Sequence, residues 1–204
     1  MKIGRQAGID TRYIDIDELH ALEPLIRLDG IEGAAYEPDG GWLNGTMMTL
    51  SWMIGAHQMG AQVVSNLAVD RVLTGNGKVT GVATSRGKVD SPIVVNCAGA
   101  WSDRIARMAG IELPIDIQRT TTTLFLKPES MKTVGPVLSD GVNQVYLRGM
   151  GDAVYRAAHF GHSGESVDAD DFDVSVSTSE LKTLRTGLDP RYDDMRRAPY
   201  LGGF

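Results

Sequence analysis

The chain has 204 residues, of which 42% are hydrophobic and 23% are charged, as in an ordinary globular protein. Its net charge of −6, without any clustered basic run, argues against nucleic-acid binding, which needs a basic face to neutralise phosphates. No apolar stretch reaches about 18 residues, so no transmembrane helix is expected, and the N-terminus lacks the apolar core of a signal peptide. The single cysteine, Cys97, excludes an internal disulfide and favours a reducing, cytoplasmic location.

A short helix and a short strand are predicted before residue 41. Asp15 or Asp17 can cap the helix, and Pro24 ends it within about two turns. Residues 34–36 are predicted to form a strand. The turn after it is Pro-Asp-Gly at 38–40, where proline fixes φ and glycine supplies a positive φ.

A longer helix is predicted from Asn44 or Thr46, either of which can cap it, to Gly60, which can close it in a left-handed turn. Its apolar residues lie on two faces, so we expect the helix to be packed on both sides. His57 lies in this helix with no second metal ligand four residues away, which favours a structural role.

Residues 61–95 are predicted to be mostly strands. A strand is expected soon after residue 61 and another from about residue 69, followed by a hairpin whose turn contains Asn76-Gly77. The β-branched run Ile93–Val95 is expected to be a buried strand in the centre of a sheet.

The stretch Ile93–Ser102 organises the rest of the chain. The expected strand is followed by the small residues Ala98-Gly99-Ala100 and then by an amphipathic helix. In α/β proteins such a junction leaves backbone bare, so that phosphates or a ribose can approach it. From the local pattern alone, a close-packed corner without a ligand is equally well supported.

The second half of the chain is predicted to be mainly strands. These are a strand over 120–127, a hairpin over 145–161 and a strand-like end over 195–204. A helix beginning at about residue 177 is indicated by a candidate capping box, in which Ser177, Thr178 or Ser179 is followed by Glu180. An acidic loop lacks the glycine and closing glutamate of an EF-hand, so we expect it to be solvated; it contains Asp168, Asp170, Asp171 and Asp173.

The segment Val94–Ser102 resembles the VV-x-AAGAW-S segment of the FAD-dependent amine and D-amino-acid oxidoreductases. This family includes sarcosine oxidase, glycine oxidase, dimethylglycine dehydrogenase and D-amino-acid oxidase. Residues 110–119 resemble the family's G-x-x-x-P-x-x-P-x-R-Q stretch, although Asp116-Ile117 stand where a second proline is usual and Thr120 replaces the glutamine. The resemblance extends from Gly8 to Met195.

The resemblance implies a mixed α/β (α+β) fold. Residues 1–119 would form a partial FAD-binding, Rossmann-like domain lacking its first βαβ, with part of the connection to the substrate domain near 27–45. Residues 120–204 would form an antiparallel or mixed substrate-domain sheet, truncated at its C-terminus. No Gly-x-Gly-x-x-Gly follows a predicted strand, so we expect an internal piece that binds FAD weakly and has no turnover by itself.

The resemblance also implies which residues contact FAD. Val69 would touch the cofactor through its backbone, and Cys97, Ala98, Gly99 and Trp101 would contact it at the junction.

Catalytic roles are implied for Tyr146, Arg148 and His159 on the hairpin. Tyr146 would shape the pocket, and His159 would polarise or hydrogen-bond the substrate. Arg148 matches the arginine that many members have after the aromatic residue, and the substrate carboxylate would be bound by Arg148 or by a residue outside this chain. Without the resemblance, each is more simply a surface or structural residue. Trp42 is interpreted either as a core residue or as a border of the substrate cavity.

The implied reaction is oxidation of the C–N bond of a small amine, either an amino acid or an N-methyl amino acid, without a metal. Two alternatives remain. A flavoenzyme of the glycerol-3-phosphate dehydrogenase type would need a more basic cavity, and a cofactor-free binding domain would keep only the fold.

Overall fold

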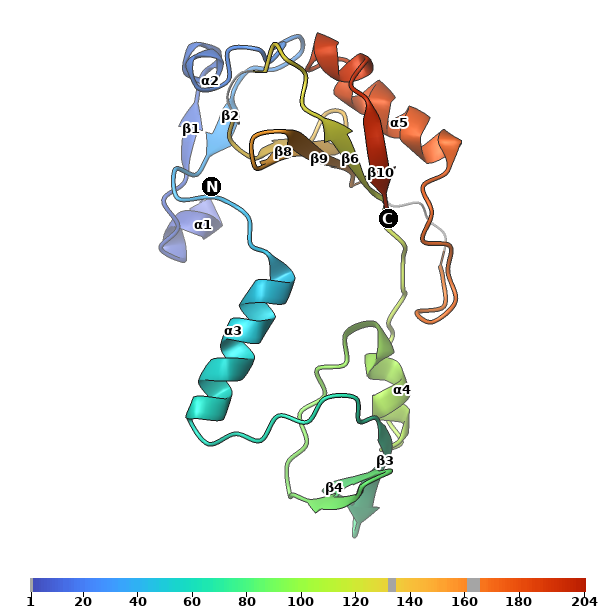
Figure 1. The fold of residues 1–204 in the computed structure, drawn as a ribbon. Helices are drawn as coiled ribbons and strands as arrows, with labels where there is room; N and C mark the ends of the chain where they lie inside the picture. The colour runs from blue at the N-terminus through green and yellow to red at the C-terminus, as the bar shows by residue number, and fades with distance from the viewer. Residues whose placement is uncertain (1, 132–134, 161–165) are drawn as a thin grey trace. The chain divides into compact units, whose positions relative to one another are not determined.

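The computed structural model describes residues 2–131, 135–160 and 166–204, and the chain divides into two compact units (Figure 1). The first unit takes its described residues from 1–42, 119–165 and 173–204, and the second comprises 43–118 and 166–172. The N-terminal residues therefore belong with the C-terminal sheet rather than with the expected cofactor domain. The end of the predicted hairpin at residue 161 lies outside the described residues.

The first unit is built on a five-stranded antiparallel sheet with strand order β10-β6-β9-β8-β7. Its strands are β6 (Thr122–Leu126), β7 (Leu138–Asp140), β8 (Val145–Met150), β9 (Val154–His159) and β10 (Tyr200–Gly203). The strand expected over 120–127 and the hairpin expected from residue 145 are both present. Hairpin strands β8 and β9 pair over six residues each, which gives the sheet its centre.

Helix α5 (Thr178–Leu188) packs on one face of this sheet. Its start is a capping box, as predicted: the Ser177 side chain accepts from the Glu180 amide, and the Glu180 carboxylate accepts from the Ser177 amide. A Cβ added at Gly187 would lie 2.5 Å from a Val145 methyl carbon, so glycine is needed for the close approach of helix to sheet. The core beneath α5 includes Phe125, Val145, Leu147, Ala157, Leu184 and Leu188.

The N-terminal part of this unit contains α1 (Lys2–Gln6), β1 (Arg12–Ile14), α2 (Ile16–Leu22) and β2 (Ala34–Tyr36), with β1 and β2 antiparallel. The Asp15 carboxylate accepts from the Glu18 amide at 2.9 Å and so caps α2. The helix ends before Pro24, as predicted. The single-turn helix η2 (Asp193–Arg196) precedes β10.

The second unit contains α3 (Gly45–Gln58), the three-stranded antiparallel meander β3 (Val69–Gly75), β4 (Lys78–Thr84) and β5 (Gly87–Asp90), the short helix η1 (Gly99–Trp101) and α4 (Ser102–Arg107). The predicted cap of α3 is correct, since Asn44 Oδ1 accepts from the Met47 amide. The predicted hairpin turn is also present, with φ of 53° at Asn76 and 73° at Gly77.

Three expectations for this unit were wrong. Ile93–Val95 is not a buried strand: it joins no strand, and Ile93 and Val95 are 74% and 77% exposed. No strand forms just after residue 61. Helix α3 has no buried residue, although packing on two faces was expected. The physical reason is shared: a strand needs a hydrogen-bonded neighbour, and an apolar helix needs an element that buries its side chains. In the described part of the chain, no strand pairs with residues 61–65 or 93–95, and no element buries a residue of α3.

No helix in the described part of the chain is long and apolar enough to cross a membrane.

Candidate functional site

An apolar cavity of about 300 Å³ lies in the second unit, between the meander and the segment that leads into η1. It brings together three of the five residues predicted to contact the cofactor, namely Val69, Cys97 and Ala98. The remaining wall is supplied by Val72, Val82, Val94, Val95, Asn96 and Ile105. The size is at the lower end for a ligand pocket and suits a flat ring better than a whole dinucleotide.

The turn beside this cavity is held by Asn96. Its Oδ1 accepts from the Ala98 amide at 3.2 Å, and its Nδ2 donates to the Ser102 carbonyl at 2.9 Å. Gly99 follows with φ of 57°, and a Cβ added there would meet nothing within 4 Å. The backbone at Gly99 is therefore uncovered. The role of Asn96 was missed, although an Asn before small residues is a known signal for such a side-chain-to-backbone turn.

Trp101 does not line the cavity. Its indole Nε1 donates to an Asp170 oxygen at 2.7 Å, and Arg104 of α4 pairs with both Asp168 and Asp170. The hydrogen bonds from Arg104 and then Trp101 lower the pKa of Asp170. The acidic loop is solvated, as expected, since the Asp168 and Asp170 side chains are each 59% exposed. The sequence did not predict that these two carboxylates also bind Trp101 of η1 and Arg104 of α4, which ties the loop to the residues after the Gly99 turn.

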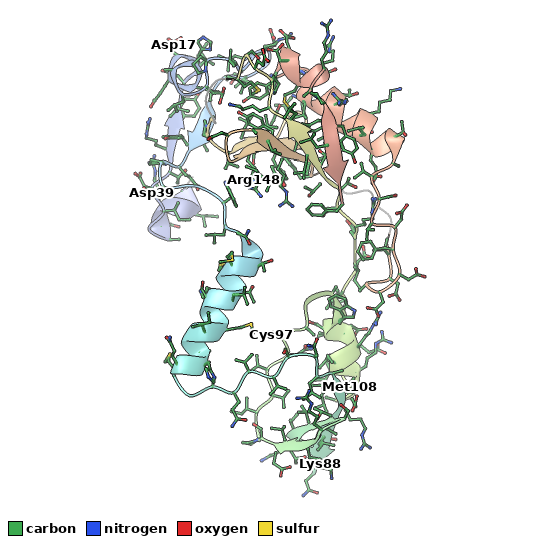
Figure 2. All side chains as sticks on the ribbon, in the orientation of Figure 1. Asp17, Asp39, Lys88, Cys97, Met108 and Arg148 are labelled. Atoms are coloured by element: carbon green, nitrogen blue, oxygen red, sulfur yellow. The ribbon has the colours of Figure 1, made fainter. Side chains whose placement is uncertain are left out.

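Tyr146 and Arg148 share the face of the first unit's sheet that lies opposite α5. Side chains alternate along a strand, and Val145 and Leu147 face the core under α5. Figure 2 labels Arg148 on the sheet of the first unit. The residue is 8% exposed, and its guanidinium carbon lies 4.0 Å from the centroid of the Trp42 ring. Its Nη1 is buried without a hydrogen-bond partner in the part of the chain that is described.

Trp42 is 46% exposed, so it is not a core residue. The ring covers one side of the Arg148 guanidinium, as in a cation–π contact. The interpretation of Trp42 as a core residue is therefore wrong, and its position at the border of a substrate cavity stays a prediction.

His159 lies on the other face of the sheet from Tyr146. It pairs with Val145, a core residue, whereas Tyr146 pairs with Ala158. His159 lines a separate, polar cavity of about 510 Å³ together with α5 residues such as Ser179 and Lys182. The hairpin therefore brings Tyr146 and Arg148 together and separates His159 from them, because cross-strand partners point to the same side of a sheet.

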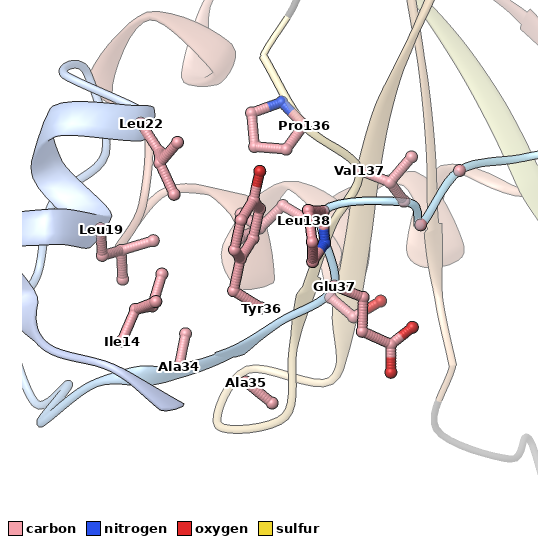
Figure 3. A pocket seen from close by; sticks show the side chains of 14 residues that line it. Ile14, Leu19, Leu22, Ala34, Ala35, Tyr36, Glu37, Pro136, Val137 and Leu138 are labelled. Carbon is pink, nitrogen blue, oxygen red and sulfur yellow. The ribbon is translucent and has the colours of Figure 1, made fainter. Parts of the chain in front are cut away.

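A third cavity, of about 580 Å³, lies between β2, α2 and the segment before β7 (Figure 3). Figure 3 shows its mainly apolar lining, including Leu19, Leu22, Tyr36 and Leu138, with the carboxylate of Glu37 at one side. It contains none of the predicted site residues.

The chain has a mixed α/β fold. Its second unit contains an apolar cavity large enough for a flat ring, and its first unit holds the nearly buried Arg148 on the sheet face opposite α5. The family model for FAD dependent oxidoreductases matches residues 1–198, and the chain belongs to this family.

Two curated relatives are similar in sequence, and one solved structure is similar in fold. The chain is 35% identical to mitochondrial sarcosine dehydrogenase of Mus musculus over 161 residues, which cover 76% of the chain and 17% of that protein. It is 30% identical to 4-methylaminobutanoate oxidase (formaldehyde-forming) of Paenarthrobacter nicotinovorans over 146 residues, 72% of the chain and 18% of that protein. L-proline dehydrogenase from P. horikoshii has a similar fold, with a TM-score of 0.86 at 21% identity, and covers 99% of the chain.

The chain thus spans less than a fifth of the two curated relatives and 53% of the L-proline dehydrogenase chain.

Proposed function

We propose that the protein acts, with FAD, as an oxidoreductase on the C–N bond of an amino acid or N-methyl amino acid. The family supports the cofactor, and relatives named for sarcosine and 4-methylaminobutanoate support an amine that also carries a carboxylate. The observation that carries the proposal is Arg148, a nearly buried cation whose Nη1 has no hydrogen-bond partner among the described residues.

Arg148 would bind the substrate carboxylate. A guanidinium offers a fork of N–H donors that matches a carboxylate, and a buried donor without a partner is costly until a ligand supplies one. The Trp42 ring stacks on the guanidinium and limits its rotation, and Tyr146 lies on the same face, one pleat along β8. Together these residues would orient the amine and limit the access of water.

The cavity residues of the second unit fit the adenine end of FAD. Val69, Cys97 and Ala98 would enclose the ring, and the uncovered backbone at Gly99 would leave room for the ribose or a phosphate. Trp101 would act indirectly, by fixing the loop at Asp170. When bound, the flavin supplies the electron-accepting chemistry, and the protein supplies binding and orientation. With one exposed cysteine, Cys97, we place the protein in the cytoplasm.

His159 is not assigned a contact with this substrate, because its side chain lies on the α5 face. A substrate on the Tyr146 face would have to reach through the sheet to touch it.

The test is anaerobic reduction of the flavin in the holoprotein by sarcosine, dimethylglycine, glycine or proline. The loss of visible flavin absorbance measures the reduction. We expect at least one of them to bleach the flavin. In Arg148→Met the KM should rise about 10- to 100-fold, the worth of a charge-assisted hydrogen bond, with a smaller change in kcat. Arg86→Met, on an exposed turn, is the matched control and should leave KM unchanged. Equal KM values for the two variants would contradict the assignment of Arg148.

A further inference from the structure

A second arginine stands directly opposite Arg148 in the sheet. Arg148 of β8 pairs with Arg156 of β9, so both side chains leave the same face, the one opposite α5. Directly opposed residues have Cβ atoms about 4.5–5.5 Å apart, and like charges in this arrangement repel. Two adjacent cations on one half-buried face therefore need a compensating anion.

The chain itself supplies little compensation. None of the ion pairs among the described residues includes Arg148 or Arg156. Arg156 donates from Nη2 to the Thr122 hydroxyl at 3.2 Å, but its Nε is buried without a partner, as is Nη1 of Arg148. Two buried donors on neighbouring guanidinium groups are thus unused in the described structure.

Each guanidinium is held by an aromatic ring. Arg148 stacks on Trp42, and the guanidinium carbon of Arg156 lies 5.3 Å from the centroid of the Phe204 ring. Because each guanidinium lies over a different ring, the two cations form two binding groups and not one shared anion site. This arrangement suits two carboxylates on one molecule better than a single compact anion.

We infer that the substrate carries a second carboxylate, which Arg156 binds while Arg148 binds the first. This inference rests on the proposed function and concerns preference within its substrate class: amino or N-methylamino dicarboxylic acids would bind more tightly than the corresponding monocarboxylic acids. Arg156 is then a specificity-determining residue: it contacts the substrate away from the C–N bond that is oxidised.

The experiment measures anion binding by the chain itself, through the fluorescence of Trp42 in a background in which Trp52 and Trp101 are phenylalanine. The probes are acetate, succinate and inorganic phosphate at constant ionic strength. We expect succinate to bind about tenfold or more tightly than acetate, and more tightly than phosphate.

Arg156→Met should bring the succinate-to-acetate ratio close to one and leave acetate binding unchanged. Arg156→Lys should keep part of the succinate preference, and Arg86→Met, the charge-matched control, should keep all of it. Circular dichroism establishes whether each variant is folded. If Arg156→Met is unfolded, the inference is tested by Arg156→Lys and by the three probes on the protein that keeps both arginines.

Equal affinities for acetate and succinate, or a preference that survives Arg156→Met, would overturn the inference. Phosphate binding as tight as succinate would also overturn it, in favour of a general dianion site. If the inference about Arg156 fails but acetate binding is lost in Arg148→Met, the proposed function is still supported. If acetate binding is the same with and without Arg148, the result counts against the proposed function itself.

Discussion

Arg191 and Asp140 form an ion pair whose side chains are each only 3% exposed. Arg191 also donates to the carbonyls of Arg27 and Asp29, and so joins the N-terminal segment to the sheet. Burial alone would raise the pKa of Asp140, but hydrogen bonds from Asn143 and Arg191 outweigh it and lower the pKa. Each charge of this buried pair is compensated by the other, so removal of one partner would leave an unpaired buried charge.

Arg191→Met should therefore destabilise the protein by about 3–5 kcal/mol, because Asp140 would be left as a buried charge without its partner. Urea unfolding of the two proteins measures the difference. The matched control is Arg196→Met, which removes a more exposed pair with Asp189 and should cost at most about 1 kcal/mol. Equal losses for the two variants would contradict the special role of burial.

Glu180 gives a prediction about pH. Burial would raise its pKa, but donors at Thr121, Arg119 and Ser177 together lower it to about 2. A carboxyl whose pKa is lower in the folded state contributes stability above its unfolded pKa, near 4.5, and loses it as the pH falls toward 2. Glu180→Gln should thus cost about 1–3 kcal/mol at pH 7 and clearly less at pH 3.

Urea unfolding at the two pH values measures this change. Glu129→Gln, at an exposed carboxyl, is the control and should show the same small effect at both. A Glu180→Gln cost that does not shrink at pH 3 would refute the linkage.

At the scale of elements, the meander of the second unit depends on one glycine in β4. Gly81 has φ of 151°, and a Cβ there would lie 2.2 Å from the Val89 carbonyl oxygen of β5. Its partners are Leu73 on one side and Asp90 on the other, so a side chain would push the strands apart. The Val69 end of the apolar cavity in the second unit is built on the same sheet.

Gly81→Ala is expected to destabilise the second unit by about 1–3 kcal/mol through backbone strain and the contact with Val89. Gly75→Ala is the matched variant at a strand position without a positive φ, where the nearest atom would be 3.6 Å away, and it should be close to neutral. Thermal unfolding followed by circular dichroism distinguishes the two. Similar melting temperatures for both would show that β4 tolerates a side chain at residue 81.

At the scale of the whole molecule, the two units differ in how much they bury. The hydrophobic core cluster lies entirely in the first unit, whereas the buried apolar residues of the second are Val72 and Ala83 in the described part of the chain. Few buried contacts mean a low free energy of local opening.

Amide hydrogen exchange should therefore be much slower in β6, β8 and β9 than in β3–β5. Addition of ADP, as a probe for the adenine end of FAD, should slow exchange around Val69 and Ala98 and leave the first unit unchanged. Mass spectrometry of the exchanged peptides measures both effects. Uniform protection across the units, or protection by ADP outside the cavity peptides, would contradict this division.

The sequence by itself determined the features that depend on residues close to one another along the chain, namely helix caps and a hairpin turn. The caps of α2, α3 and α5 and the Asn76-Gly77 turn depend on side chains within a few residues of the backbone they bind, so the pattern placed the turn and narrowed each cap to two or three neighbouring residues. The structure then selects Asp15, Asn44 and Ser177. The segment Val94–Ser102 also resembles the family's segment, and this resemblance predicted the family that the family model then confirmed.

Only the tertiary structure decided what depends on partners far along the chain. Strand register put Tyr146 and Arg148 on one face and His159 on the other, and it placed Arg156 beside Arg148. The apolar run Ile93–Val95 has the composition of a strand but, in the described chain, no neighbour to pair with. Composition sets what a segment can become, whereas the hydrogen bonds and burial that decide it come from residues that only the fold brings near.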